Sequence, residues 1–313
     1  MKQVRHGLQG ERTLIVLTGA TGFLGSNLLG KLLADGYEVA AIVRTNSSLA
    51  RIEGWVDHRN IKLYNIEKTN PRSIFEENKV DAIVHTATEY GRGGGAISRI
   101  LEPNLILPIR LIELGIEYKT ACFINTDSYF NKGGSTYSNL LNYSLSKKSL
   151  LVWLKQLSSQ IRIVNVTLEH MYGPGDSRSK FVENLIQEIA VERIPRVRLT
   201  HGHQKRDFIY VDEVADAFIK LIEYGRTHEF TFKNFEVGTG ESIQVRDFAR
   251  TIKDLSHSPS ILGFGDIQYR SDEIMDSKAD ISALVELGWS PKIGTREGLS
   301  RILHCYGVNI AVR

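Results

Sequence analysis

A glycine-rich turn between a short apolar segment and an amphipathic one is the feature that most constrains how this chain can fold. Residues 18–25 have the sequence T-G-A-T-G-F-L-G, and the apolar residues 14–17 before them predict a buried parallel strand. Residues 26–34 carry leucines at helical spacing, which predicts a helix. A strand, a glycine turn and a helix in this order are typical of the opening of a dinucleotide-binding unit, although such turns also occur without a ligand.

Each glycine of this turn has its own physical role. Gly19 permits the tight turn, Gly22 lets a pyrophosphate approach the backbone, and Gly25 lets the helix pack closely against the strand. The N-terminus of the helix offers unpaired N–H groups and the positive end of a dipole to the phosphates. The turn therefore predicts these cofactor-binding residues: Gly19, Thr21, Gly22, Phe23, Leu24 and Gly25.

The composition is that of an ordinary globular protein. Of the 313 residues 42% are hydrophobic and 24% charged, and the formal net charge of +3 is too small to indicate binding to nucleic acid or to a membrane surface. No apolar run reaches the length that spans a bilayer. Cys122 and Cys305 lack the spacing of metal ligands, and His201 and His203 have no partner ligands nearby, so we expect no metal site and a reduced, cytoplasmic protein. Residues 1–12 contain no apolar signal core and are expected to form a loose tail.

Alternating strand and helix signals predict an α/β protein with a Rossmann-like, doubly wound parallel sheet. The predicted strands are residues 14–17, 38–43, 61–66, 82–85, 121–125 and 161–168. The predicted helices are residues 26–34, 71–78, 97–114 and 142–157, followed by 180–191 and 213–223 around a short strand at 206–211. We expect an NADP(H)-binding domain over 13–172, to which 206–237 return, and a smaller C-terminal sugar-nucleotide-binding lobe over 173–205 and 238–307.

Polar residues follow the second and fourth predicted strands, at the sheet edge where ligands bind in such folds. Arg44 with Ser47 favours NADP(H) over NAD(H), because a guanidinium pairs with the 2′-phosphate that NAD(H) lacks; the alternative is an exposed arginine at a strand end. Thr86, Ala87 and Thr88 lead into a glycine-rich loop and are assigned to the cofactor as well.

Tyr143 and Lys147 are the candidate catalytic pair. They are four residues apart in a predicted helix and therefore lie on one face of it. A phenol with a pKa near ~10 is a poor acid or base at neutral pH, but a nearby ammonium favours the phenolate and lowers that pKa. Lys147 can also bond the nicotinamide ribose, and Thr126, after the fifth strand, can bond the same substrate oxygen as Tyr143.

These motifs resemble those of the extended short-chain dehydrogenase/reductase family that acts on nucleotide sugars. The resemblance covers residues 14–303 and includes the glycine turn, N-T-D-S at 125–128, Y-x-x-x-K at 143–147, and later blocks at 171–176, 206–212 and 287–291. It implies that Asn65 and Ile66 lie beside the adenine, although Asn65 stands where many relatives carry Asp. It implies substrate contacts from Asp127, Ser128, His170, Arg206 and Arg270, the two arginines holding a diphosphate.

Within this family, four stretches resemble the CDP-abequose and CDP-paratose synthases. They are H-T-A-T-E-Y-G at 85–91, N-T-D-S-Y-F at 125–130, L-E-H-M-Y-G-P-G-D at 168–176 and D-E-I-M at 272–275. The resemblance implies NADPH-dependent reduction of the C4 ketone of a CDP-4-keto-3,6-dideoxyhexose for O-antigen or related glycan synthesis. It also implies a homodimer, packed through the helices that follow Gly95 and Asn142. Thr167 departs from the arginine of many relatives, near His170.

Two other functions remain open from the sequence. A nucleotide-sugar 4-epimerase or a 4,6-dehydratase of the family would keep its NAD(H) bound and recycle the hydride. Dehydratases carry Thr-Asp-Glu where this chain has Thr126, Asp127 and Ser128, and a serine is too weak a base to replace the glutamate. A non-catalytic NAD(P)-binding protein of this fold would lack the proton-transfer residues that are present here.

Overall fold

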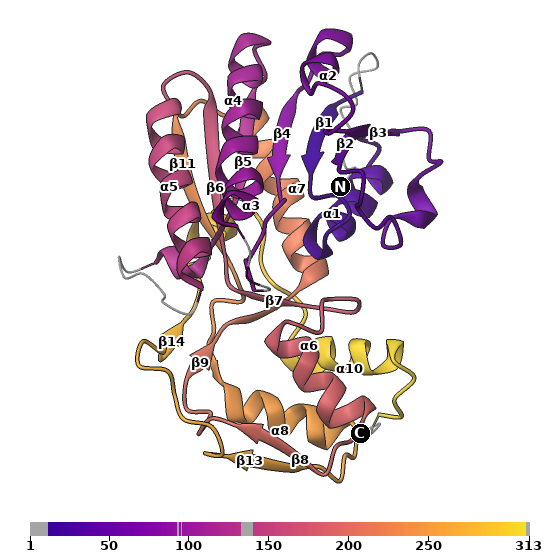
Figure 1. Ribbon diagram of the computed structural model, residues 1–313, viewed down its shortest axis with the longest axis vertical. Coiled ribbons are helices and arrows are strands. Elements are labelled where there is room, and N and C mark those ends of the chain that lie inside the picture. Colours follow the sequence, from indigo (N-terminus) through magenta and orange to yellow (C-terminus); the bar gives the residue numbers. More distant parts are fainter. Residues whose placement is uncertain (1–11, 93, 95, 133–139, 311–313) are drawn as a thin grey trace, which may run out of the picture.

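The computed structural model describes residues 12–92, 94, 96–132 and 140–310. Its centre is a parallel sheet of seven strands in the order β11-β6-β5-β4-β1-β2-β3 (Figure 1). The strands are β1 Leu14–Thr18, β2 Glu38–Val43, β3 Ile61–Asn65, β4 Ala82–His85, β5 Cys122–Ser128, β6 Arg162–Leu168 and β11 Phe232–Val237. The predicted doubly wound α/β fold is confirmed, and all six predicted strands are present. The seventh, β11, extends the sheet beside β6 in parallel register, Phe232 opposite Ile163.

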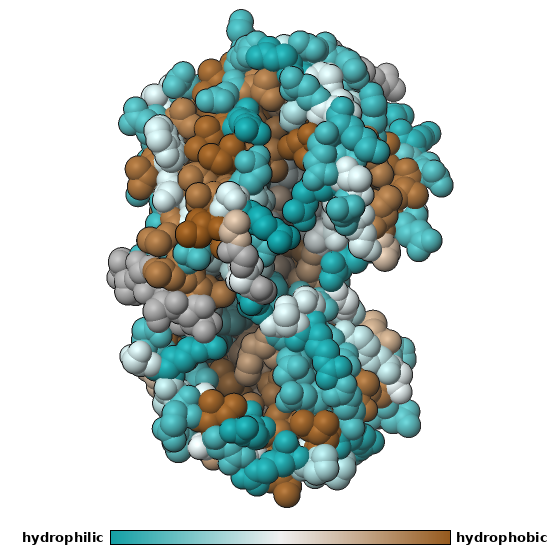
Figure 2. Space-filling view, in the orientation of Figure 1, coloured by the Kyte–Doolittle hydropathy of each residue, from teal (hydrophilic) through white to brown (hydrophobic). Residues whose placement is uncertain are grey.

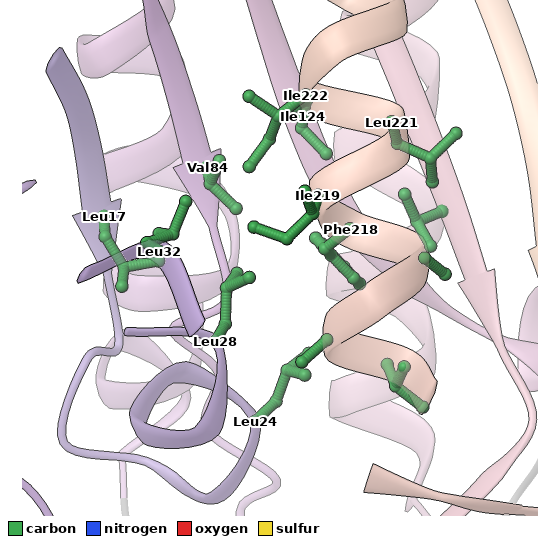
Figure 3. Packing of buried hydrophobic residues seen from close by; sticks show 14 of the residues in the cluster. Leu17, Leu24, Leu28, Leu32, Val84, Ile124, Phe218, Ile219, Leu221 and Ile222 are labelled. Carbon is green, nitrogen blue, oxygen red and sulfur yellow. The ribbon is translucent and has the colours of Figure 1, made fainter. Parts of the chain in front are cut away.

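Helices cover both faces of this sheet. On one face α1 (Phe23–Ala34) packs against α7 (Val211–Thr227), where Leu28, Leu32 and Phe218 are completely buried over the strands (Figure 3). On the other face α4 (Leu107–Glu117) and α5 (Leu141–Leu157) contribute to a second core, joined by the short α2 (Arg72–Glu77). Each fully buried leucine stabilises the fold by roughly 1.5–3 kcal/mol, so these cores hold the strand ends in fixed positions.

The remaining elements form a smaller part below the sheet in Figure 1, with a core of its own. Its strands pair as β7 with β10, as β8 with β13, and as β12-β9-β14. They are β7 His170–Tyr172, β8 Arg196–Leu199, β9 Lys205–Arg206, β10 Phe208–Tyr210, β12 Ile243–Gln244, β13 Ile261–Phe264 and β14 Asp276–Ser277. Its helices are α6 Phe181–Ile186, α8 Val245–Leu255 and α10 Thr295–Cys305. The short α9, Ser282–Glu286, packs instead against the core of the larger part, beside β11.

Several predicted elements differ from those observed. The first helix begins at Phe23, three residues earlier than predicted, because Gly22 is its N-cap. The helix predicted over 97–114 is divided into α3 (Ile97–Leu101), a π-helical turn (Glu102–Ile106) and α4, and prolines stand at the start of the second and third pieces. The strand predicted over 206–211 is interrupted at Asp207.

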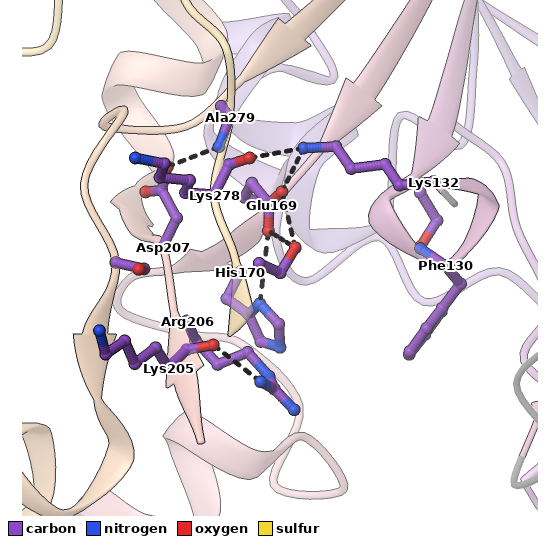
Figure 4. A network of polar contacts seen from close by, with 12 residues as sticks. Phe130, Lys132, Glu169, His170, Lys205, Arg206, Asp207, Lys278 and Ala279 are labelled. Atoms are coloured by element: carbon purple, nitrogen blue, oxygen red, sulfur yellow. Dashed lines mark hydrogen bonds and ion pairs between the residues drawn. The ribbon is translucent and has the colours of Figure 1, made fainter. Parts of the chain in front are cut away.

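Asp207 interrupts the strand because its buried carboxylate serves as an acceptor for another loop. It accepts hydrogen bonds from the backbone N–H groups of Thr239, Gly240 and Ala279 and from the Thr239 hydroxyl. The predicted helix after it, 213–223, extends from Val211 to Thr227. Asp207 thus ties three segments of the chain together, and Figure 4 shows it beside Ala279.

Within the described ranges, the helices are all too short or too polar to cross a membrane. The predicted loose tail, 1–12, lies outside the described residues except for Arg12. The division into domains at 173–205 and 238–307 stays a prediction.

Candidate active site

A large cavity lies between the carboxyl ends of the sheet strands and the smaller part of the molecule. Its volume is about 2070 Å³, and Figure 2 shows the surface hollowed at the waist between the two parts. Pockets for one small ligand typically measure about 300–1,000 Å³, so this space can hold two ligands side by side. Its position at the carboxyl ends of the strands is the one expected for an open parallel sheet.

The glycine turn forms one wall of the cavity and has the geometry of an anion site. Gly19 has φ +70°, and a Cβ there would lie 2.6 Å from the Ala87 backbone nitrogen, so only glycine fits. Gly22 N–H donates to Gly19 C=O at 2.8 Å, which closes the turn. No side chain caps the N-terminus of α1, and its first turn contains no acidic residue. These free N–H groups fit the pyrophosphate of a dinucleotide.

The structure brings nearly all of the predicted site residues to this cavity. Those lining it are Gly19, Thr21, Gly22, Phe23, Leu24, Gly25, Arg44, Ile66, Thr86, Ala87, Thr88, Thr126, Asp127, Ser128, Tyr143, Lys147, His170, Arg206 and Arg270. Asn65 does not line it, because its amide donates to Thr45 Oγ1 at 3.1 Å and accepts from Glu67 N–H at 3.0 Å. Ile66 and Glu67 line the cavity in its place.

The three polar residues at the end of β5 differ in what they can offer a substrate. The Asp127 carboxylate accepts from Ser128 N–H at 2.8 Å, Asn131 Nδ2 at 2.7 Å and Asn165 Nδ2 at 3.1 Å, so the protein already satisfies it. Burial nevertheless raises the pKa of Asp127, opposed by Lys147. Thr126 Oγ1 is buried in the cavity wall without a hydrogen-bond partner. An unsatisfied buried hydroxyl at this place is available to a ligand oxygen.

Tyr143 is positioned as predicted, but its ionisation differs from the prediction. We expected Lys147 to lower the pKa of Tyr143; the structure has that pKa well above its usual value. Burial is the main cause, followed by Tyr90, and a hydrogen bond from Ser128 opposes it. Lys147 Nζ donates instead to the backbone carbonyl of Thr126 at 2.8 Å. Burial lowers the pKa of Lys147 to about 8, and Asp127 opposes that shift.

Aromatic rings surround the Tyr143 phenol. The Tyr90 ring stacks on it with centroids 4.8 Å apart, and Phe130 meets it edge to face at 6.2 Å. Tyr129 lies between Phe130 and His170, with ring centroids 4.2 Å and 4.4 Å away. The ring of Tyr143 is thus packed among aromatic rings.

Asn104 is a supporting residue that the sequence did not reveal. It is completely buried in the π-helical turn, where its Nδ2 donates to Glu89 C=O and to Ser146 Oγ, each at 2.9 Å. Ser146 Oγ in turn donates to Tyr143 C=O at 2.7 Å. Asn104 therefore fixes the loop after β4 to the helix that carries Tyr143. The two prolines, Pro103 and Pro108, were the sequence signal for an irregular helix here.

The diphosphate arginine predicted from the sequence is already paired. Arg206 is 7% exposed, and its Nη2 donates to the Glu273 carboxylate, a second residue that sequence analysis did not single out. His170 lies nearby with Nδ1 unpartnered and 4.0 Å from the Glu169 carboxylate (Figure 4). Burial and the charge of Arg206 lower the pKa of His170 to about 3, so this imidazole is neutral.

Basic side chains connect the segment 175–180 to the sheet across the cavity. Arg51 donates to Gly175 C=O at 2.8 Å and 3.1 Å and to Thr21 C=O at 3.4 Å. Arg92 donates to Ser179 C=O, and Lys180 Nζ donates to Tyr90 Oη at 3.3 Å. These contacts place the segment over the glycine turn and beside Tyr90, which stacks on Tyr143.

Comparison with known sequences agrees with this geometry. Residues 15–238 match the model of the NAD dependent epimerase/dehydratase family. The CDP-abequose synthase of Salmonella muenchen is 35% identical over 292 residues, which cover 92% of this chain and 96% of that protein. The CDP-abequose synthase of Salmonella typhimurium is 33% identical over 302 residues, which cover 92% of this chain and 97% of that protein.

Solved structures share the fold. A mutant UDP-glucuronic acid 4-epimerase of Bacillus cereus, in complex with a UDP-sugar and NAD, superposes with a TM-score of 0.80 at 22% identity, covering 94% of this chain and 99% of that one. A UDP-glucose 4-epimerase of Thermotoga maritima, solved with UDP-glucose, superposes with a TM-score of 0.78 at 21% identity, covering 94% of this chain and 99% of that one.

Proposed function

Because the chain belongs to the NAD dependent epimerase/dehydratase family, we propose that it is a nucleotide-sugar 4-ketoreductase. Its substrate is a CDP-4-keto-3,6-dideoxyhexose, and its product is a CDP-3,6-dideoxyhexose of the abequose or paratose type, used for O-antigen or a related glycan. The relatives named CDP-abequose synthase support the nucleotide sugar, since this chain covers nearly their whole length.

The surroundings of Tyr143 are the observation that carries this proposal. A sugar that lacks hydroxyls at C3 and C6 presents apolar carbons on both sides of its C4 ketone. The Phe130 ring beside the Tyr143 phenol suits such carbons, because a sugar hydroxyl packed against that ring would lack a partner. The free hydroxyl of Thr126 is available to the ketone oxygen.

The residues that hold the cofactor are those of the glycine turn and of the loops after β2 and β4. We propose NADP(H), because Arg44 and Ser47 line the cavity beside the end of β2. When bound, NADPH supplies the hydride that reduces the ketone. The uncapped N-terminus of α1 binds the pyrophosphate, and Lys147 orients the nicotinamide ribose.

Proton transfer is the part of the reaction that the protein itself performs. Tyr143 donates its proton to the oxygen on C4 as negative charge develops there. Thr126 donates a hydrogen bond to the same oxygen, and Ser128 holds the phenol in place. The high pKa of Tyr143 keeps the phenol protonated at neutral pH, as a proton donor requires. Arg206 and Arg270 bind the diphosphate; Arg206 exchanges its Glu273 partner for it.

The experiment that tests this function measures NADPH absorbance against a panel of 4-keto sugar nucleotides, with NMR of the sugar product. We expect NADPH loss equal to product formed with CDP-4-keto-3,6-dideoxyglucose. Product formed without net NADPH loss would show a 4-epimerase. Because Ser128 replaces the glutamate of the dehydratases, we expect no 4-keto-6-deoxy product from CDP-glucose or TDP-glucose. Appearance of that product would overturn the assignment.

We also propose a homodimer in the cytoplasm. Leu141, Leu145 and Val152 form a stripe on α5, with exposed fractions of 47%, 47% and 68%, and Trp153 beside them is half exposed. Ile97 on the neighbouring α3 is 55% exposed. A large apolar surface formed by two adjacent helices suits contact with a second copy of the chain. The cytoplasmic location rests on the two unpaired cysteines.

A further inference from the structure

One rung of the parallel sheet carries polar residues across five adjacent strands. Thr18 of β1 lies opposite His85 of β4, which lies opposite Asn125 of β5. Asn125 lies opposite Asn165 of β6, and Asn165 lies opposite Asn234 of β11. The first four side chains are at most 1% exposed, whereas parallel strands covered on both faces are normally apolar. A buried polar rung beside the active site departs from that rule and calls for a functional reason.

The three asparagines of this rung, which we call the asparagine row, lead to the carboxylate of Asp127. Asn125 Nδ2 donates to Asn165 Oδ1 at 2.7 Å. Asn165 Nδ2 donates to Asn234 Oδ1 at 2.7 Å and to Asp127 Oδ2 at 3.1 Å. Both hydrogens of the Asn165 amide are therefore used, which fixes one of its N–H groups toward Asp127.

The hydrogen bonds that the described residues make to the Asp127 carboxylate all come from N–H groups. Besides Asn165 Nδ2, the donors are Asn131 Nδ2 and the backbone N–H of Ser128. A protonated carboxyl would need an acceptor for its own hydrogen, and none of these three groups is one. Asp127 is 3% exposed and burial raises its pKa, but this set of donors stabilises the ionised form.

The Lys147 ammonium lies beside this carboxylate. Its Nζ donates to the carbonyl of Thr126, which belongs to the peptide bond between Thr126 and Asp127. Burial lowers the pKa of Lys147, and Asp127 is the charged group among the described residues that raises it. Two other titratable groups face the pair. They are His85, whose pKa burial and Lys147 lower, and Tyr143, whose pKa burial raises most and Asp127 raises further.

We propose that Asp127 is a positioning residue of the reaction: the asparagine row holds its carboxylate ionised, and that charge keeps Lys147 an ammonium beside the cofactor ribose. This inference rests on the proposed reductase function. Thr167, where many relatives carry arginine, lies directly opposite Asp127 on β6. An arginine there would pair with the carboxylate, whereas threonine leaves the carboxylate charge to Lys147.

The pH dependence of kcat/KM tests the role of Asp127, with full-length enzyme, NADPH and CDP-4-keto-3,6-dideoxyglucose. Asp127→Asn keeps the size of the side chain but removes its charge, so the alkaline decline that Lys147 sets should begin about one pH unit or more lower. Asp207→Asn is the matched control, since that carboxylate is also buried and bonded by backbone N–H groups but does not line the cavity. In this control the decline should keep its position.

Two outcomes of that experiment would overturn the proposal. One is an alkaline decline that does not move in Asp127→Asn. The other is a KM for the sugar nucleotide that rises equally at every pH with the decline in place, which would indicate that Asp127 contacts the sugar directly.

The asparagine row is tested through the ionisation of Asp127 itself. In NMR spectra of wild-type enzyme with isotopically labelled aspartate, Asp127 should be ionised at neutral pH. Asn131→Ala removes one donor outside the sheet and Asn165→Val removes one from the row, so each should raise the pKa of Asp127. A protonated Asp127 in wild type, or unchanged titration in the variants, would contradict the role of the row. If Asn165→Val does not fold, wild type and Asn131→Ala still decide.

A measurement without substrate separates this inference from the proposed function. In NMR titrations of the free enzyme with isotopically labelled lysine, Asp127→Asn should lower the pKa of Lys147. An unchanged Lys147 titration would overturn the inference even if the enzyme is the proposed reductase. If wild type oxidises NADPH with no 4-keto sugar nucleotide, the proposed function fails, and the Lys147 titration still decides whether Asp127 maintains its charge.

Discussion

Lys147 Nζ and the backbone carbonyl of Thr126 are joined by a 2.8 Å hydrogen bond, which anchors the ammonium to the strand that ends at the reacting centre. Burial lowers the pKa of Lys147 to about 8, so in the free enzyme the charge is present below that pH and is lost as the pH rises through it. If Lys147 orients the nicotinamide ribose as proposed, the ammonium that does so is lost at alkaline pH.

We therefore predict that kcat/KM declines as the pH rises through about 8, since this parameter reports groups of the free enzyme. In Lys147→Arg the decline should disappear from this range, because the guanidinium stays charged, although its different shape lowers the rate at all pH values. The measurement is a pH profile of initial NADPH oxidation. A wild-type profile that stays flat up to pH values well above the pKa of Lys147 would contradict this role.

Removing one oxygen tests the proton donor. Tyr143→Phe keeps the ring between Tyr90 and Phe130, so folding and NADPH binding should persist while turnover falls by roughly 10²–10⁴. NADPH oxidation and a cofactor-binding titration measure the two properties separately. Tyr224→Phe, on α7 outside the cavity, serves as the control. Near-normal turnover would remove Tyr143 from the mechanism.

Arg44 should set the choice of cofactor. A charge-assisted hydrogen bond to the 2′-phosphate contributes roughly 1.5–3 kcal/mol, so Arg44→Ala should reduce the preference for NADPH over NADH by about tenfold or more. The ratio of kcat/KM for the two cofactors is the measurement, with Arg250→Ala on α8 as a control away from the cavity. Equal constants for the two cofactors in wild type would refute the prediction.

The buried charges of Arg206 and Glu273 should be tolerated in the free enzyme only while both are present, because each neutralises the other. Both side chains are largely buried, at 8% and 14% exposure, so Arg206→Gln leaves a buried carboxylate unpaired and should cost about 3–5 kcal/mol of unfolding free energy. Adding Glu273→Gln should restore much of that loss, as seen in urea unfolding. Arg196→Gln, which breaks the exposed pair with Asp266, should cost no more than about 1 kcal/mol. If Arg206→Gln and the double variant lose the same unfolding free energy, an unpaired Glu273 carboxylate is not what destabilises the single variant, and the prediction is wrong.

The stripe on α5 should determine the oligomeric state. Val152→Asp and Leu145→Asp place a charge on the exposed apolar face and should convert a dimer to a monomer without unfolding it. Light scattering after size-exclusion chromatography measures the mass. Val285→Asp, which is equally exposed but on α9, should leave the dimer intact. A monomeric wild type would remove the proposed interface.

The sequence by itself determined the local features of this protein, which depend only on residues close together in the chain. The strand at 38–43 was predicted with its observed bounds, and the glycine turn and the Tyr143–Lys147 spacing were correct, because periodicity, steric freedom and helix geometry act over a few residues. The interruption at Asp207 was missed, because the donors that its carboxylate satisfies come from residues 239, 240 and 279.

Only the tertiary structure decided how these residues behave chemically. Tyr90 and Lys180 are ninety positions apart and meet because the segment 175–180 folds back over the sheet edge, a long-range contact that no local pattern encodes. The pKa of Tyr143 was predicted in the wrong direction because burial, which depends on every element packed around the phenol, exceeds the effect of one lysine a helical turn away. Arg206 was identified from its motif, but its Glu273 partner lies in a distant loop that only the fold brings to it.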